Sequence, residues 1–140
     1  ASIYGNTAAV AHRIAERLRS KGEEVREIDL CRSDMSEAVG QAFRFGKMVL
    51  CAASYDSGVF PPMHAFLYKL SIKGYQSRRV GVVENGTWAP TAGKTICSML
   101  QQMKNIEIAS PILTIRSTWK EDYKQDLEKL VEGMIWEECM

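Results

Sequence analysis

The sequence lacks the features by which several classes of protein are recognised. Its four cysteines form no CxxC pair and its two histidines form no HxH or HxxxH pair, so neither a disulfide framework nor a metal site is predicted. No apolar run approaches the roughly 20 residues of a membrane-spanning helix. Acidic and basic residues are mixed along a chain of net charge +1, which leaves no basic stripe for nucleic acid. We therefore expect reduced thiols and a cytoplasmic protein.

What the sequence does contain is a regular series of helical patterns within 140 residues, a length that fits one domain over residues 1–140. Apolar residues recur at helical spacing over residues 7–20, and Gly22 is placed to end that helix. A capping-box pattern predicts a last helix after Thr118, with Glu121 three residues on. Between them, helices are predicted from Asp34, from Pro61 or Pro62, and around residues 96–103.

Strand-like segments alternate with these helices. Continuous apolar runs at residues 48–53 and 80–83 are typical of strands buried on both faces of a parallel sheet. Residues 25–30 predict an edge strand, and residues 106–115 a strand interrupted near Pro111. The alternation predicts right-handed βαβ units and a parallel sheet covered by helices on both faces. That pattern also requires a strand before Ser2, so we expect a first strand missing from this sequence.

Three loops follow the predicted strands at their carboxyl ends, where parallel α/β sheets bind ligands: residues 2–7, 54–63 and 84–92. The first loop offers hydroxyl and amide groups directly before a helix, together with the unpaired N–H groups of the helix start. That combination suits a phosphate, although the loop contains no lysine or arginine. The alternative is an ordinary N-cap by Asn6 or Thr7 without any ligand.

The second and third loops each contain one residue that suits a flat ligand. Gly58 lets the backbone approach such a ligand closely, unless the loop is only a strand-to-helix connection. Trp88 offers a stacking face for an aromatic ring, unless it is a partly buried lid over the core. The stretch WAPTAGKT nearly fits the phosphate-binding Walker A pattern, but Trp88 replaces its first glycine. Nucleotide hydrolysis is therefore not predicted, and the missing G-x-G-x-x-G motif disfavours a dinucleotide site.

The three loops together carry a resemblance to a known family. SIYGNT resembles the phosphate loop [ST]-x-[TY]-G-x-T of the flavodoxin-like family. SYDSGVFPPMHAFL and GTWAPTAG are similar to the second and third loops in the flavodoxin domain of A-type flavoproteins, the flavo-diiron proteins. The resemblance implies a flavodoxin-like three-layer α/β sandwich with a parallel sheet of order 2-1-3-4-5, and it implies FMN as cofactor.

The resemblance also assigns the residues around FMN, and it implies neither a catalytic side chain nor a metal ligand. The phosphate would be held by Ser2, Ile3, Tyr4, Gly5, Asn6 and Thr7. The isoalloxazine would be bordered, mainly through backbone groups near its N5 edge, by Tyr55, Asp56, Ser57, Gly58 and Phe60. Another part of the ring would be covered by Asn85, Gly86, Thr87 and Trp88. The pair Ala89-Pro90 departs from the serine and glycine more common in the family.

The implied function is that of an FMN-binding electron-transfer domain. Its expected partners are redox proteins, namely a reductase or rubredoxin as donor and an acceptor such as a di-iron domain, with no nucleic acid and no membrane. Whether the chain forms a homodimer is open. Two alternatives are open as well. One is a flavin-dependent NAD(P)H or quinone reductase, and the other is a degenerate flavodoxin-like interaction module that binds no FMN.

Overall fold

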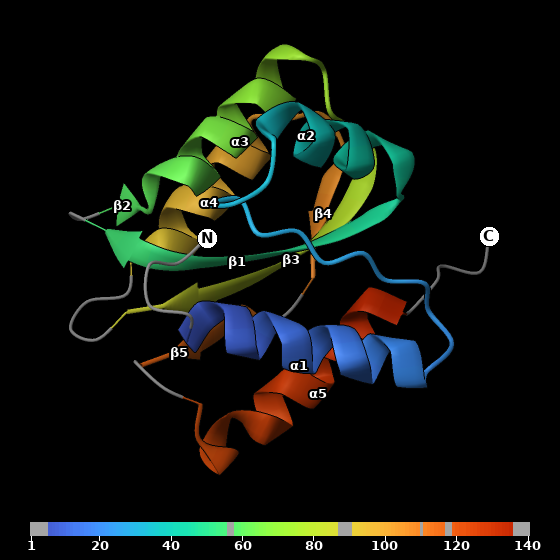
Figure 1. Cartoon of the computed structure of the whole chain (residues 1–140), viewed down its shortest axis with the longest axis vertical. Coiled ribbons are helices and arrows are strands. Elements are labelled where there is room, and N and C mark those ends of the chain that lie inside the picture. The colour runs from blue at the N-terminus through green and yellow to red at the C-terminus, as the bar shows by residue number, and fades with distance from the viewer. Residues whose placement is uncertain (1–5, 56–57, 87–90, 110, 117–118, 136–140) are drawn as a thin grey trace.

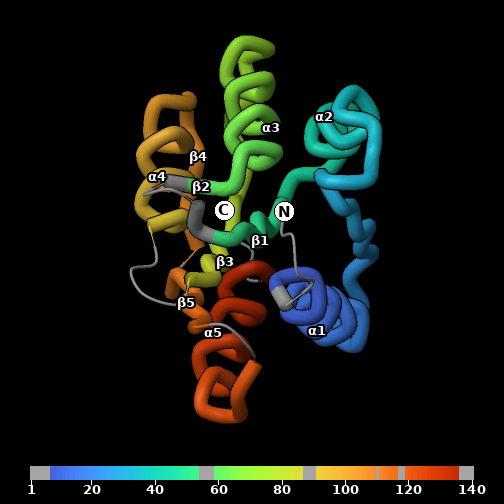
Figure 2. The backbone as a smooth tube through the Cα atoms, turned by 60° about the vertical axis from the view of Figure 1, so that its left-hand side comes forward, coloured from blue at the N-terminus to red at the C-terminus, as the bar shows by residue number. Residues whose placement is uncertain are grey.

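The computed structural model describes residues 6–55, 58–86, 91–109, 111–116 and 119–135. They form three layers, with a sheet between two layers of helices (Figures 1 and 2). The helices are α1 (Asn6–Ser20), α2 (Met35–Arg44), α3 (Pro61–Ile72), α4 (Ala92–Gln101) and α5 (Lys124–Ile135), and α5 is preceded by the 3-10 turn η1 (Glu121–Tyr123). The strands are β1 (Lys47–Tyr55), β2 (Gly58–Val59), β3 (Arg78–Asn85), β4 (Ile106–Ile108) and β5 (Leu113–Ile115).

The sheet is built on β1 and β3, which run parallel in register from the pair Lys47–Arg79 to the pair Ala53–Asn85. Strands β4 and β5 both pair with β3 in parallel, so the predicted strand at residues 106–115 is interrupted around Pro111 as expected. The predicted order of the last three strands is thereby confirmed. The strand at residues 48–53 lies next to the one at 80–83, which lies next to the one at 106–115. Strand β2 was not predicted, and it pairs antiparallel with the end of β1.

The sheet separates two hydrophobic cores. Helices α2, α3 and α4 cover one face, and α1 and α5 cover the other (Figure 2). The largest fully buried side chains of the first core are Leu67, Leu70, Tyr75, Ile96 and Leu100. Those of the second core include Val10, Ile14, Leu113, Ile115 and Leu130. The helical apolar faces predicted from the sequence therefore pack against the sheet, because apolar surface removed from water stabilises the fold.

Local sequence signals explain most helix ends. Gly22 follows α1 with a φ of +88°, a conformation that glycine adopts without strain. Asp34 caps α2 by accepting a hydrogen bond from the N–H of Ser36 at 3.1 Å. The capping box predicted for the last helix is wrong at Glu121. This residue lies in η1 and not in the first turn of α5. The other member of the box, Thr118, lies outside the described residues.

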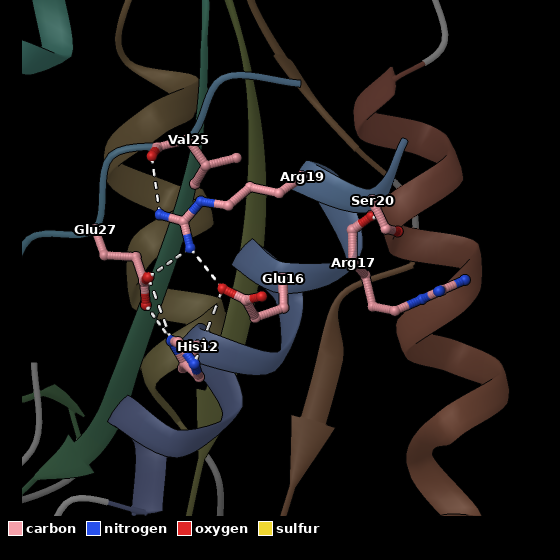
Figure 3. A network of polar contacts seen from close by, with 7 residues as sticks. All are labelled: His12, Glu16, Arg17, Arg19, Ser20, Val25 and Glu27. Carbon is pink, nitrogen blue, oxygen red and sulfur yellow. Dashed lines mark hydrogen bonds and ion pairs between the residues drawn. The ribbon is translucent and has the colours of Figure 1, made fainter. Parts of the chain in front are cut away.

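The predicted strand at residues 25–30 is also wrong, because this segment has no regular secondary structure. A strand needs a neighbour for its hydrogen bonds, and no strand pairs with this segment in the described part of the chain. Side chains of α1 hold it instead (Figure 3). Arg19 donates to the carbonyl of Val25 at 2.9 Å and to the carboxylate of Glu27 at 3.0 Å. His12 contacts the same carboxylate at 3.1 Å.

A cavity of about 890 Å³ separates that segment from β1. It is lined by apolar side chains of β1, by one face of α1 and by residues 23–32. Met48, Val49 and Cys51 of β1 are only partly buried beside it, although the sequence pattern of β1 is that of a strand covered on both sides. None of the helices in the described ranges is long and apolar enough to cross a membrane.

Candidate functional site

Two of the three predicted loops begin next to each other. Ala53 of β1 is the register partner of Asn85, the last residue of β3. The N–H of Phe60 returns to the carbonyl of Ala53 at 3.0 Å, and the N–H of Gly86 donates to the carbonyl of Ile115 at 3.0 Å. The arrowheads of β1 and β3 therefore lie on one side of the molecule, where α1 also begins (Figure 1). This is the edge at which parallel α/β sheets bind ligands.

The first loop leads into α1, and Thr7 lies in the first turn of that helix. Its side chain is 2% exposed, and its Oγ1 atom has no hydrogen-bond partner among the described residues. No acidic residue occupies the first turn of this 15-residue helix. The helix start therefore has unpaired N–H groups, the positive end of the helix dipole and a buried hydroxyl, all of which favour an anion.

Thr7 at the start of α1 and Phe60 at the end of the second loop are both among the residues that line the cavity described above. Phe60 is half-buried and directly precedes α3, which begins with Pro61. Pro61 fits there because the first N–H of a helix has no partner inside the helix. The described residues of the third loop do not line this cavity. The third loop starts beside the second because β1 pairs with β3.

The structure places seven of the fifteen predicted cofactor-binding residues. Asn6 and Thr7 open α1, Tyr55 ends β1 opposite Gly58 of β2, and Phe60 precedes α3. Asn85 ends β3 and is 9% exposed, and Gly86 follows it. The remaining eight lie outside the described residues: Ser2, Ile3, Tyr4, Gly5, Asp56, Ser57, Thr87 and Trp88.

Sequence reasoning missed Glu84, which it treated as the first residue of a polar loop. The structure places Glu84 within β3, where it is 7% exposed. Burial raises the pKa of its carboxyl group, and hydrogen bonds from the N–H of Gly93 and the side chain of Thr114 oppose that rise. A glutamate directly after the apolar run at residues 80–83 was the signal for a buried carboxyl at the end of a central strand.

The Cys51 thiol and the surface group of His12, Glu16 and Glu27 are further candidate sites of chemistry, and the structure explains both without a ligand. Burial raises the pKa of the Cys51 thiol to about 12, so this thiol stays protonated at neutral pH. His12, Glu16 and Glu27 bring possible metal ligands together on the surface. Arg19, however, pairs with both of those carboxylates, at 2.8 and 3.0 Å, which makes the group an exposed ion-pair network (Figure 3).

Comparison with known proteins fixes the family. Residues 1–130 match the family model described as Flavodoxin. The chain belongs to the flavodoxin family. Flavodoxins bind FMN and transfer electrons, so the family supports an electron-transfer role of the FMN type. No curated protein sequence matches this flavodoxin-family chain.

Solved structures share the fold at low sequence identity. A flavodoxin from the domain Archaea is 19% identical, with a TM-score of 0.82, and the match covers 96% of this chain and 91% of that protein. Rubredoxin oxygen:oxidoreductase from Desulfovibrio gigas is 14% identical, with a TM-score of 0.88, over 94% of this chain and 33% of that one. The flavodiiron protein from Giardia intestinalis is 17% identical, with a TM-score of 0.80, over 95% and 34%. This chain thus spans about a third of the two larger proteins.

Proposed function

We propose that this chain binds FMN at the carboxyl end of its sheet, through the residues predicted above, and transfers electrons between redox proteins. The observation that carries the proposal is the Oγ1 atom of Thr7, which is buried at the start of α1 without a partner among the described residues. Leaving a buried hydroxyl unpaired costs about 1–3 kcal/mol. A phosphate oxygen at that place would accept its hydrogen bond and would remove the cost.

The surroundings of Thr7 fit a phosphate ester better than a free cation or a neutral ligand. The N–H groups of the first turn of α1 are donors without partners inside the helix, and the helix dipole adds a positive potential. Thr7 and Phe60 both line the adjoining cavity, which continues along β1 to Lys47 and along α1 to Leu18.

The remaining predicted residues have roles around the ring. Tyr55, Gly58 and Phe60 would border it from the turn between β1 and α3, and Asn85 and Gly86 would hold the start of the third loop. Asp56, Ser57, Thr87 and Trp88, together with Ser2 to Gly5 at the phosphate, remain predictions. Bound FMN supplies reversible one- and two-electron redox chemistry, so the chain itself needs only to bind the cofactor, orient it and shield one part of the ring.

The proposed partners are redox proteins, namely a reductase or rubredoxin as donor and a di-iron centre as acceptor. Two observations support this class. The fold is shared with rubredoxin oxygen:oxidoreductase and with a flavodiiron protein, and the electron-transfer role follows from the family. The thiols of Cys51 and Cys97 also agree with the reducing cytoplasm in which we place this carrier.

The test is an equilibrium titration of the chain with FMN and with riboflavin, which lacks the phosphate. Thr7→Val removes the hydroxyl and keeps the side-chain shape. We expect it to weaken FMN about ten- to hundredfold, the equivalent of about 1.5–3 kcal/mol for a hydrogen bond to a charged group, and to leave riboflavin affinity unchanged. Ser20→Ala at the other end of α1 is the matched control, since it also removes a hydroxyl but lies far from the site.

Three results would argue for something else. Equal losses for FMN and riboflavin in Thr7→Val would move the phosphate away from α1. A chain that binds neither flavin would favour the interaction module. Steady NAD(P)H-driven quinone reduction by the FMN-loaded chain would favour the reductase over the carrier.

A further inference from the structure

Glu84 connects three elements at the carboxyl end of the sheet. It lies one residue before the end of β3, opposite Ala52 of β1 and Thr114 of β5. Its carboxyl group accepts hydrogen bonds from the backbone N–H of Gly93, in the first turn of α4, and from the side chain of Thr114. A single buried side chain thus joins the end of β3 to the start of α4 and to β5.

Those contacts close the base of the third loop. The loop leaves β3 at Gly86 and enters α4 after Thr91, and the carboxyl group of Glu84 reaches across to Gly93 on the far side. Its first residue is fixed independently, because the N–H of Gly86 donates to Ile115 of β5. The two described ends of the third loop are therefore held in place, Gly86 by β5 and Gly93 by Glu84.

Gly93 makes this anchoring possible. A Cβ atom at residue 93 would fall well inside the contact distance of the Glu84 carboxylate, and it would also touch Ile112 at 3.4 Å. Glycine is otherwise unfavourable inside a helix, by about 1 kcal/mol relative to alanine. The carboxylate of Glu84 therefore reaches the backbone of α4 because residue 93 is glycine and has no Cβ atom.

We infer that Glu84 is a positioning residue for the flavin, and that a change in its ionisation shifts the base of the third loop, at Gly86 and Gly93, and the reduction potential of bound FMN. This inference rests on the proposed function. An ionised carboxylate accepts both hydrogen bonds and interacts favourably with the start of α4. A protonated carboxyl must donate its own hydrogen and becomes a weaker acceptor, so one of the two contacts weakens. The charge itself also opposes the addition of an electron nearby.

Among the described residues, no other charged group contributes to the pKa shift of Glu84. Ala52 and Thr114, its neighbours on β1 and β5, do not titrate. On α4, the thiol of Cys97 has a pKa raised by burial and, second, by the charge of Glu84, so it stays neutral where glutamates titrate. Lys94 on the same helix is exposed. A pH-dependent change at the loop base within the acidic range therefore reports on Glu84.

The test follows the backbone amide signals of Gly86 and Gly93 by NMR across the acidic pH range, in the full chain without FMN. We expect both signals to shift with one shared midpoint in the wild type and in Glu132→Gln, an exposed glutamate of α5 that serves as control. The shift should be lost in Glu84→Gln. Glu84→Asp keeps a carboxyl that is one methylene too short for Gly93, so the shift at Gly93 should be lost there as well.

The second measurement is the midpoint potential of the FMN-loaded chain against pH. The midpoint potentials of the wild type and of Glu84→Gln should differ by an amount that depends on pH. This difference should change at the pH at which the amide signals shift. Amide signals that do not titrate in the wild type, or a potential difference that is constant with pH, would overturn the inference. If no FMN binds, the proposed function fails, while the amide titration still decides whether Glu84 controls the loop base.

Discussion

Thr7 and Glu84 are both buried polar side chains at the same edge of the sheet, but they differ in their partners. The hydroxyl of Thr7 has no partner in the described part of the chain, whereas the carboxyl of Glu84 has two. Buried polar groups in folded proteins are nearly always hydrogen-bonded. The unpaired hydroxyl at the start of α1 therefore favours a ligand there, whereas the carboxyl of Glu84 is held by the chain itself. Under the proposed function, the Thr7 hydroxyl would face the phosphate of FMN, whereas the Glu84 carboxyl is already bonded within the chain.

The largest effect on stability is expected from a substitution that disturbs the contact between Glu84 and Gly93. Gly93→Ala brings a Cβ atom against the Glu84 carboxylate and Ile112. Overpacking of this kind costs about 1–3 kcal/mol, so the free energy of unfolding should fall by that amount in urea denaturation. Gly40→Ala in α2 is the control, because a Cβ there meets nothing within 4 Å. It should raise stability by up to about 1 kcal/mol. Equal effects of the two substitutions would contradict the close contact.

The next effect is a change in how stability depends on pH. Burial raises the folded-state pKa of Glu84, so between the unfolded value, about 4.3, and that raised value the folded chain binds more protons. Stability should consequently fall as pH rises through this interval. Glu84→Gln should remove the fall, which urea denaturation at a series of pH values would measure. A constant difference between the two proteins at every pH would show that the folded-state pKa is not raised.

A smaller effect is expected at Thr7, where the same substitution should weaken FMN binding but stabilise the chain without FMN. Without FMN, Thr7→Val replaces an unpaired buried hydroxyl by a methyl group and should raise the free energy of unfolding by about 1 kcal/mol. Thermal denaturation of the chain without FMN would detect this gain. A loss of stability would mean that the hydroxyl has a structural partner, and the comparison with Glu84 would then fail.

The smallest effect is expected at a surface ion pair away from the binding edge. Arg17 of α1 donates twice to Glu128 of α5, at 2.7 and 2.9 Å, and these bonds lower the pKa of that carboxyl. Glu128→Gln should cost little, because exposed ion pairs are screened by water. The cost should be present above about pH 4.3 and lost as the pH falls through the lowered pKa. A large or pH-independent loss in urea denaturation would be unexpected; Glu132→Gln is again the control.

Most of the fold could be predicted because apolar periodicity directly reflects burial. The helical patterns over residues 7–20, from Asp34, from Pro61 or Pro62 and around residues 96–103 all form helices, and the apolar runs at residues 48–53 and 80–83 form the parallel strands β1 and β3. Residues 25–30 show the limit of that reasoning. Their alternating pattern fits a strand, but a strand depends on a neighbour that a local pattern does not contain.

The candidate site could be predicted only in part. Motifs predict roles for Thr7 and Asn85, because hydroxyls, amides and glycines before helices and after strands have local signatures. The role of Glu84 depends on a glycine nine residues later and on a threonine of β5, which meet only in the folded chain. Nor does the sequence indicate that the Oγ1 atom of Thr7 lacks a partner, because that depends on the packing around α1.

The most direct test of the central claim is the amount of FMN that the purified chain retains, measured by its visible absorbance after excess cofactor is removed. Our account predicts one FMN per chain, with riboflavin retained much less because it lacks the phosphate that would satisfy Thr7. A chain that retains no FMN, even after incubation with a large excess, would contradict the assignment of this edge of the sheet as a flavin site.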